Sequence, residues 1–240
     1  MRYCTLAQRV GQGFPKVYGI LHHMGPIIGI TADHHEKRHR VAIAYAQSII
    51  SAGGVPVILP PVVSQIDHFL SICNGFVFTG GDDPQMEQWG ISTLACVTPV
   101  APERQAFETT LLTSLQDQKS VPVFGVCLGM QWMGLLAGGS LEQDLSEPQA
   151  SHHTNGEHPI TGELGNGLVH SHHHQALVDV GTLCVVATAE DDVIEAVRDY
   201  SRAWYVGVQW HPERTEDPAL GQELFNQFVE AAQVGRVVSA

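Results

Sequence analysis

A cysteine between two glycines is the first position at which this sequence suggests chemistry. Cys127 stands in the stretch GVCLG, after an apolar run at 121–125 and before a segment in which Met130, Met133 and Leu136 have helical spacing. The glycines carry no Cβ, so the backbone can turn sharply and a substrate can approach. A strand, a tight turn and a helix in this order predict a nucleophile elbow that carries a thiol. At a helix N-terminus the thiolate is favoured, and the thiolate is the form that attacks carbonyl groups.

A histidine followed by a carboxylate supplies the second part of this chemistry. His211 and Glu213 come directly after the apolar stretch VGVQW at 206–210. Beside a thiol nucleophile, the histidine takes and returns the proton, and the carboxylate fixes its tautomer and orientation. Cys127 alone would more often be a small buried core residue. Its pairing with the histidine motif instead predicts a catalytic triad of Cys127, His211 and Glu213.

The elements that must position these residues alternate between strands and helices. A polar, histidine-rich stretch at 34–39 precedes the first helix. Residues 85–101 are expected to form a loop beside the pocket. Residues 146–168 are also expected to form a loop, because they are polar and rich in glycine and proline. The alternation predicts an α/β fold, a three-layer sandwich with a mostly parallel central sheet, and places Cys127 at the carboxyl edge of that sheet. Apolar runs predict strands at 27–30, 55–59, 75–78, 121–125, 183–187, 193–197 and 205–209, and helical spacing predicts helices at 41–51, 65–72, 102–116 and 218–232.

Two motifs, GVCLGMQ and VQWHPE, resemble the class I glutamine amidotransferase superfamily, whose Cys-His-Glu triad lies on a flavodoxin-like sheet. Other stretches resemble its γ-glutamyl hydrolase branch, typified by γ-glutamyl-γ-aminobutyrate hydrolases; they are GITAD, AGGVPVILPP, FTGGDDP, GGSLEQDL and HSHHHQAL. The resemblance runs from Pro26 to Ala231. It implies a single hydrolase domain over residues 26–240, preceded by an extension at 1–25 to which the sequence assigns no role.

The resemblance also implies an activity. A chain of this branch is expected to cleave the γ-glutamyl amide bond of a small compound, such as γ-glutamyl-γ-aminobutyrate, through a γ-glutamyl thioester, and to release glutamate and an amine. In the family, the oxyanion is held by two backbone amides. One is expected from Gly81 or Gly80 and the other from Leu128. The chemistry requires no cofactor.

Residues 170–175 are expected to line the substrate pocket. Relatives read Val-Asn-Ser-x-His-His-Gln here, and His170 takes the place of their asparagine. A purely structural role is one alternative, and a zinc site is another. On a strand, His172 and His174 would share a face and could share an ion, whereas His173 would point the other way. We expect no metal. The substrate-binding residues that the resemblance implies are Gln131, Ser171, His173, His174 and Gln175.

Two departures from the branch bear on the pocket. The branch commonly has an Arg-Asp pair where this chain has Arg104-Gln105. The sequence leaves open whether Arg104 is a surface charge or part of a network behind the pocket. The segment 146–168 is also shorter than usual in the branch, where it closes over the substrate.

Composition excludes several classes of partner. A formal charge of −13 disfavours nucleic acid, which requires clustered lysine and arginine. No apolar run approaches the roughly 20 residues that a membrane span needs. Five scattered cysteines without a C-x-x-C motif favour reduced thiols and a cytoplasmic protein. Two other functions stay open: a glutaminase subunit that delivers ammonia to a synthetase partner, and a non-enzymatic binding protein. The sequence is also compatible with a homo-oligomer.

Overall fold

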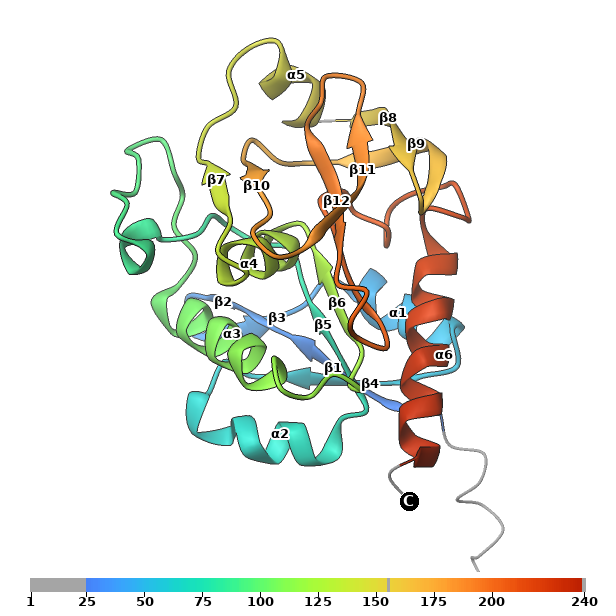
Figure 1. Ribbon diagram of the computed structural model, residues 1–240. Helices are drawn as coiled ribbons and strands as arrows, with labels where there is room; N and C mark the ends of the chain where they lie inside the picture. Colours follow the sequence, from blue (N-terminus) through green and yellow to red (C-terminus); the bar gives the residue numbers. More distant parts are fainter. Residues whose placement is uncertain (1–24, 155, 239–240) are drawn as a thin grey trace, which may run out of the picture.

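Short apolar runs rich in β-branched residues form the core of a central sheet. The computed structural model describes residues 25–154 and 156–238, and within them the main sheet has nine strands. Five strands run parallel in the order β4-β1-β5-β6-β13, which is the flavodoxin-like order for successive βα units (Figure 1). They are β1 (Ile27–Thr31), β4 (Val55–Leu59), β5 (Gly75–Phe78), β6 (Val123–Val126) and β13 (Tyr205–Val208).

The sheet continues beyond β13 with four antiparallel strands. Their order is β12 (Ile194–Arg198), β11 (Cys184–Ala189), β8 (Gly156–Gly162) and β9 (Gly165–Ser171). The prediction of a loop at 146–168 is therefore wrong, because this segment contains α5 (Gln149–Thr154), β8 and most of β9. Gly162 and Gly165 flank a tight hairpin turn, which explains the loop-like composition. The burial of His158 and Ile160 between exposed neighbours shows the alternation of a strand.

Two small hairpin-like sheets complete the strands. Residues 33–40, which the sequence indicates only as a polar stretch, form β2 (Asp33–His35) and β3 (Arg38–Arg40). The pair β7 (Ser140–Glu142) and β10 (Ala176–Asp179) forms beside the main sheet. Both small sheets lie next to the ends of parallel strands, so they can supply side chains to that edge.

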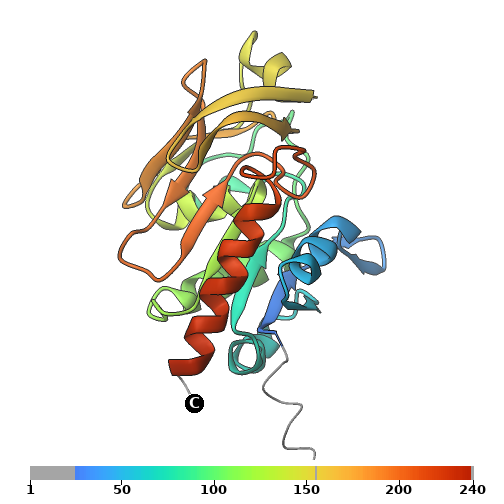
Figure 2. The ribbon, with the colours of Figure 1, turned by 90° about the vertical axis from the view of Figure 1, so that its right-hand side faces the viewer.

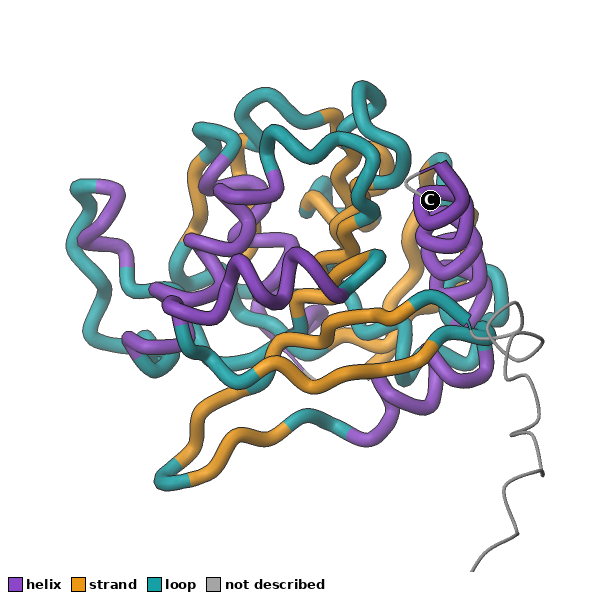
Figure 3. The backbone as a smooth tube through the Cα atoms, turned by 90° about the horizontal axis from the view of Figure 1, so that it is seen from below, coloured by secondary structure: helices purple, strands orange, loops and turns teal. Residues whose placement is uncertain are grey.

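Helices cover both faces of the parallel half (Figures 2 and 3). On one face, α1 (Ile43–Ser51) contacts α6 (Gln222–Val238); on the other lie α2 (Ile66–Ile72), α3 (Pro102–Leu115) and α4 (Leu128–Leu136). Successive residues of one strand point to opposite faces of the sheet. Phe124 packs on the side of α1 and α6, and Val123 packs on the side of α2, α3 and α4. The predicted three-layer sandwich is confirmed. Short 3-10 turns occur at η3 (Val63–Gln65) and η4 (Met86–Trp89).

Glycines bring α4 unusually close to the sheet. A Cβ at Gly125 would lie 2.4 Å from the sulfur of Met133, and one at Gly129 would lie 2.3 Å from the carbonyl oxygen of Phe78. Both distances are shorter than real Cβ contacts allow, so only glycine fits this packing. The start of α4, and with it Cys127, is thereby held against β5 and β6.

Some expectations concern residues that the structure does not describe. The predicted extension at 1–25 lies almost entirely outside the described residues and stays a prediction. Among the described residues, none of the helices has the length and apolar composition needed to span a membrane. The cysteines described at positions 73, 96, 127 and 184 are all free thiols.

Candidate active site

Cys127 occupies the turn between β6 and α4. Its backbone has a φ of 51° and a ψ of −105°, a left-handed φ that is uncommon outside glycine. Such strain, of order 1–3 kcal/mol, persists where the surrounding structure enforces it and is typical of nucleophile elbows. The amide of Cys127 donates to the carbonyl of Val208 at 2.8 Å, which ties the elbow to β13. The side chain is 6% exposed.

The pairing of β6 with β13 brings the distant histidine to this cysteine. Val126 and Val208 are in register on parallel strands, so the two strands end at the same edge of the sheet. His211 Nδ1 lies 2.9 Å from Oε1 of the buried Glu213. The other nitrogen of His211 is not used by Glu213, and His211 and Cys127 line the same cavity. The structure thus brings the three predicted triad residues together.

The charge state of His211 follows from these neighbours. Burial lowers its pKa, but the hydrogen bonds to Cys127 and Glu213 and the charges of both groups outweigh burial and raise the pKa of His211 to about 10. At neutral pH the imidazole is therefore protonated. An imidazolium beside a thiol stabilises the thiolate and holds a proton for a leaving group.

A buried arginine shapes the loop opposite the thiol. Arg104 is fully buried, and its guanidinium pairs with Glu108 at 3.1 Å and Asp33 at 3.2 Å. Its Nη2 also donates to the carbonyl oxygens of Thr79 and Gly80, each at 3.0 Å. The sequence left the role of Arg104 open, and the structure places it in a network behind the pocket.

These contacts determine where the amides of the loop point. In a trans peptide the N–H points opposite to the C=O. With the carbonyls of Thr79 and Gly80 facing Arg104, the following amides face the other way. The amide of Gly80 donates to the hydroxyl of Tyr45 at 3.1 Å and is thus occupied. Of the two predicted glycine donors, Gly81 is the better candidate for the oxyanion.

The predicted substrate residues divide into two groups. Gln131, His173, His174 and Gln175 line a cavity of about 200 Å³ that also reaches Cys127 and Gly81. Ser171 does not line this cavity, because it is fully buried and its hydroxyl donates to the carbonyl of His153 at 2.9 Å. The side chain of His173 turns toward Glu195 at 3.5 Å. His174 lies between Asp83 and Asp144, at 3.1 and 3.3 Å. Substrate contact by all five residues stays a prediction.

Two further residues lie at the site and were not among the predicted site residues. The amide Nε2 of Gln209 lies 3.5 Å from Sγ of Cys127. Its place in VQWHPE, two residues before His211, is a signal that could have identified it. Tyr45 contacts the loop of Gly80 from α1, and nothing in the sequence around it marks a site residue.

A second cavity meets the first at Cys127 and Gly81. It measures about 540 Å³, and its walls include Tyr45, His211 and two arginines, Arg40 and Arg214. Arg40 comes from the β2-β3 hairpin, and Arg214 follows Glu213. The thiol therefore lies between a smaller cavity with carboxylates, histidines and glutamines and a larger one that adds two arginines to two aspartates, Asp33 and Asp82.

The fold and this site define a class I glutamine amidotransferase-type protein. A solved structure from Thermoplasma acidophilum, described as a GMP synthase subunit, shares the fold with a TM-score of 0.66 at 15% identity, over 91% of this chain and 99% of that one. The family model of peptidase C26 matches residues 26–213, and the chain belongs to that family.

Relatives carry two kinds of name. A glutamine amidotransferase-like protein of Lactococcus lactis is 32% identical over 198 residues, which are 73% of this chain and 82% of that one. A γ-glutamyl-γ-aminobutyrate hydrolase of Escherichia coli O157:H7 is 27% identical over 253 residues, which are 87% of this chain and 94% of that one. The predicted superfamily is confirmed, and the chain is a glutamine amidotransferase-like hydrolase.

Proposed function

We propose that this chain hydrolyses the γ-glutamyl amide bond of a small compound through a thioester on Cys127. The observation that carries the proposal is a buried thiol at a strained elbow that shares a cavity with His211, whose Nδ1 lies 2.9 Å from Oε1 of Glu213. The thiolate attacks the γ-carbonyl carbon and forms a C–S bond. Backbone amides of Gly81 and Leu128 hold the oxyanion.

The remaining steps use His211 twice. The imidazolium gives its proton to the leaving nitrogen as the C–N bond breaks, and the amine departs. Neutral His211 then takes a proton from a water molecule that attacks the thioester. The C–S bond breaks, glutamate leaves, and the thiolate–imidazolium pair is restored.

The two cavities support an assignment of the substrate's ends. The smaller cavity, with Gln131 and Gln175 in its wall, suits the compact γ-glutamyl group. The larger cavity contains Arg40 and Arg214, whose side chains are 58% and 46% exposed. Their Nε atoms pair with Asp33 at 3.0 Å and with Glu213 at 3.5 Å, and their terminal nitrogens remain for an anion. Two guanidinium groups beside the leaving group suit an amine that carries a carboxylate. γ-Aminobutyrate has this chemistry.

Removal of the nucleophile tests the activity. Cys127→Ala should lower hydrolysis of γ-glutamyl-γ-aminobutyrate, measured as released glutamate, by at least about 10³-fold, because no thioester can form. Cys184→Ala, which removes an exposed thiol, is the control and should retain wild-type turnover. Near-wild-type turnover by pure, folded Cys127→Ala would refute the mechanism. Glutamine hydrolysis that appears only with added synthetase would instead identify a glutaminase subunit.

A pair of matched substrates tests the leaving-group assignment. The double change Arg40→Ala and Arg214→Ala should raise KM for γ-glutamyl-γ-aminobutyrate by about 10-fold, since hydrogen bonds to a charged group are lost. KM for γ-glutamyl-n-butylamide, of similar length but without the carboxylate, should stay unchanged. Arg38→Ala in the same hairpin is the control. An equal rise in KM for both substrates would show that the arginines do not bind the carboxylate of the leaving group.

A further inference from the structure

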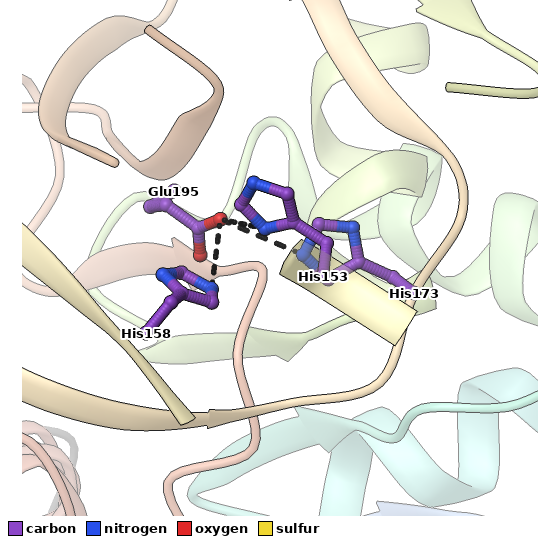
Figure 4. A group of neighbouring side chains, drawn as sticks. All are labelled: His153, His158, His173 and Glu195. Carbon is purple, nitrogen blue, oxygen red and sulfur yellow. Dashed lines mark ion pairs between the residues drawn. The ribbon is translucent and has the colours of Figure 1, made fainter. Parts of the chain in front are cut away.

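Three histidines converge on one buried carboxylate outside the triad. His153, His158 and His173 each direct a ring nitrogen at Oε1 of Glu195, at 3.2, 3.5 and 3.5 Å (Figure 4). All four side chains are at least nine-tenths buried. They come from α5, β8, the segment after β9, and β12, so residues distant in the chain meet at one point.

The outer nitrogen of each histidine is already bound to an acceptor. Nε2 of His153 lies 3.2 Å from the carboxylate of Asp191. Nδ1 of His158 lies 3.3 Å from the carbonyl of Pro159, and Nδ1 of His173 lies 2.9 Å from the carbonyl of Gln175. Carbonyl and carboxylate oxygens only accept, so these three nitrogens carry the protons. The ring nitrogens that face Glu195 are then unprotonated and present lone pairs to its carboxylate.

Lone pairs that face a carboxylate need a cation between them. The inner nitrogens of the three histidines and both oxygens of Glu195 are buried without a hydrogen-bond partner. Unsatisfied buried polar atoms are costly, and so many in one place indicate an absent ligand. A single added proton would satisfy one histidine, and three buried imidazolium groups would repel one another. A metal ion satisfies all four ligands at once.

We propose that His153, His158, His173 and Glu195 bind a zinc ion. Zinc takes nitrogen and carboxylate ligands at about 2.0–2.1 Å, and a tetrahedral site then has ligand atoms about 3.3 Å apart. The three nitrogen–oxygen distances here lie close to that edge length, and all ligand atoms lie within 4.8 Å of one another. Small side-chain rotations would close the wider spacings.

The ligand set indicates a structural ion. Four protein ligands complete a tetrahedron and leave no open position for water or substrate. The outer partners of the histidines are the kind that orient metal ligands and fix their tautomers. The ion would cross-link α5, β8 and β12 with the segment that follows β9, all in the antiparallel half of the molecule. A cleft lined by His153, His158 and Asp191 provides a path of entry.

This site differs from the one that the sequence analysis considered. His172 and His174 would have shared the ion there, but His172 is exposed and His174 pairs with Asp83 and Asp144. His173, which strand alternation excluded, turns inward to meet residues from α5 and β8. The expectation of no metal is thus replaced by a proposal at another place.

Metal content tests the proposal without use of enzyme activity. Full-length protein made without a polyhistidine tag, loaded with zinc and freed of excess, should contain about one zinc per chain by plasma mass spectrometry. Cobalt in place of zinc should give the visible absorption bands of a tetrahedral site. Glu195→Gln and His158→Ala should lose most of the metal and the cobalt bands. His152→Ala, an exposed neighbour, is the control and should retain both.

Stability gives a second readout. Removal of metal by a chelator should lower the Tm of the wild-type protein and leave the Tm of Glu195→Gln unchanged, because only a bound ion stabilises the folded state by linkage. Folded wild-type protein that retains less than about a tenth of an equivalent of zinc after loading would overturn the proposal. Full zinc content in both ligand variants would overturn it as well, since the ion would then lie elsewhere.

Discussion

The side chains around Cys127 divide into those that react and those that hold backbone atoms in place. The reacting groups carry recognisable patterns: glycines on both sides of a cysteine, and a histidine two residues before a glutamate. These patterns predicted the triad because sulfur, imidazole and carboxylate do the chemistry themselves. Tyr45 and Arg104 act on the peptide groups of residues 79–81 instead. Contacts to a backbone leave no such pattern in a sequence.

The raised pKa of His211 has a consequence for stability at alkaline pH. His211 has a pKa near 6.5 when unfolded and about 10 when folded, so the folded protein binds the extra proton between these values. This stabilisation is complete below pH 6.5 and is lost as the pH rises toward 10. An ionised Cys127 gives up one proton for the one that His211 gains, so the test uses a Cys127→Ala background. There we expect the free energy of unfolding, measured with urea, to fall more steeply over this window with His211 in place than with the additional change His211→Asn.

The comparison with His211→Asn cancels the other groups that titrate in the same window. Glu213→Gln should give an intermediate slope, because the buried Glu213 carboxylate is one of the groups that raise the pKa of His211. Parallel curves for Cys127→Ala with and without His211→Asn would show that folding does not stabilise the imidazolium.

At the scale of elements, the contact of α4 with β5 and β6 is the feature that positions the thiol. Gly129→Ala should lower the free energy of unfolding by about 1–3 kcal/mol, since its Cβ would meet the carbonyl oxygen of Phe78 at 2.3 Å. Urea unfolding measures the effect. A displaced α4 should also slow alkylation of Cys127 by iodoacetamide.

Gly235 in α6 provides the matched control. A Cβ there has its nearest neighbour at an ordinary 3.4 Å, so Gly235→Ala should raise the free energy of unfolding by about 0.5–1 kcal/mol through a lower chain entropy and a better helix propensity. Equal changes in the free energy of unfolding for the two substitutions would show that the close approach of α4 to the sheet does not contribute to stability.

Elements with strong periodicity were predictable, and those with mixed signals were not. The strands 55–59 and 75–78 have the predicted bounds, because each is a short apolar run bounded by turn residues. The strands β8 and β9 carry polar residues that face a polar cluster, and glycines at their turn resemble loop composition. An interior made partly of histidines cannot be recognised from hydrophobic alternation.

At the scale of the molecule, the sheet has two halves with different origins of stability. The parallel half is covered by helices on both faces, with large apolar clusters on each side. The βα alternation of the sequence predicted this half. In the antiparallel half, apolar runs predicted β11 and β12, whereas the β8-β9 hairpin is less hydrophobic and joins the sheet through the pairing of β8 with β11. Pairing of that kind is determined by the whole fold, so a local pattern does not indicate it.

The register of β6 with β13 joins the proposed nucleophile to its proposed base across a large gap in the chain. Cys127 leaves the ribosome well before His211, with all of β7 to β12 still to be made in between. A nascent chain that ends within that interval holds the thiol but lacks the proton acceptor. Under the proposed mechanism, the complete set of catalytic groups therefore forms only when the last parallel strand docks.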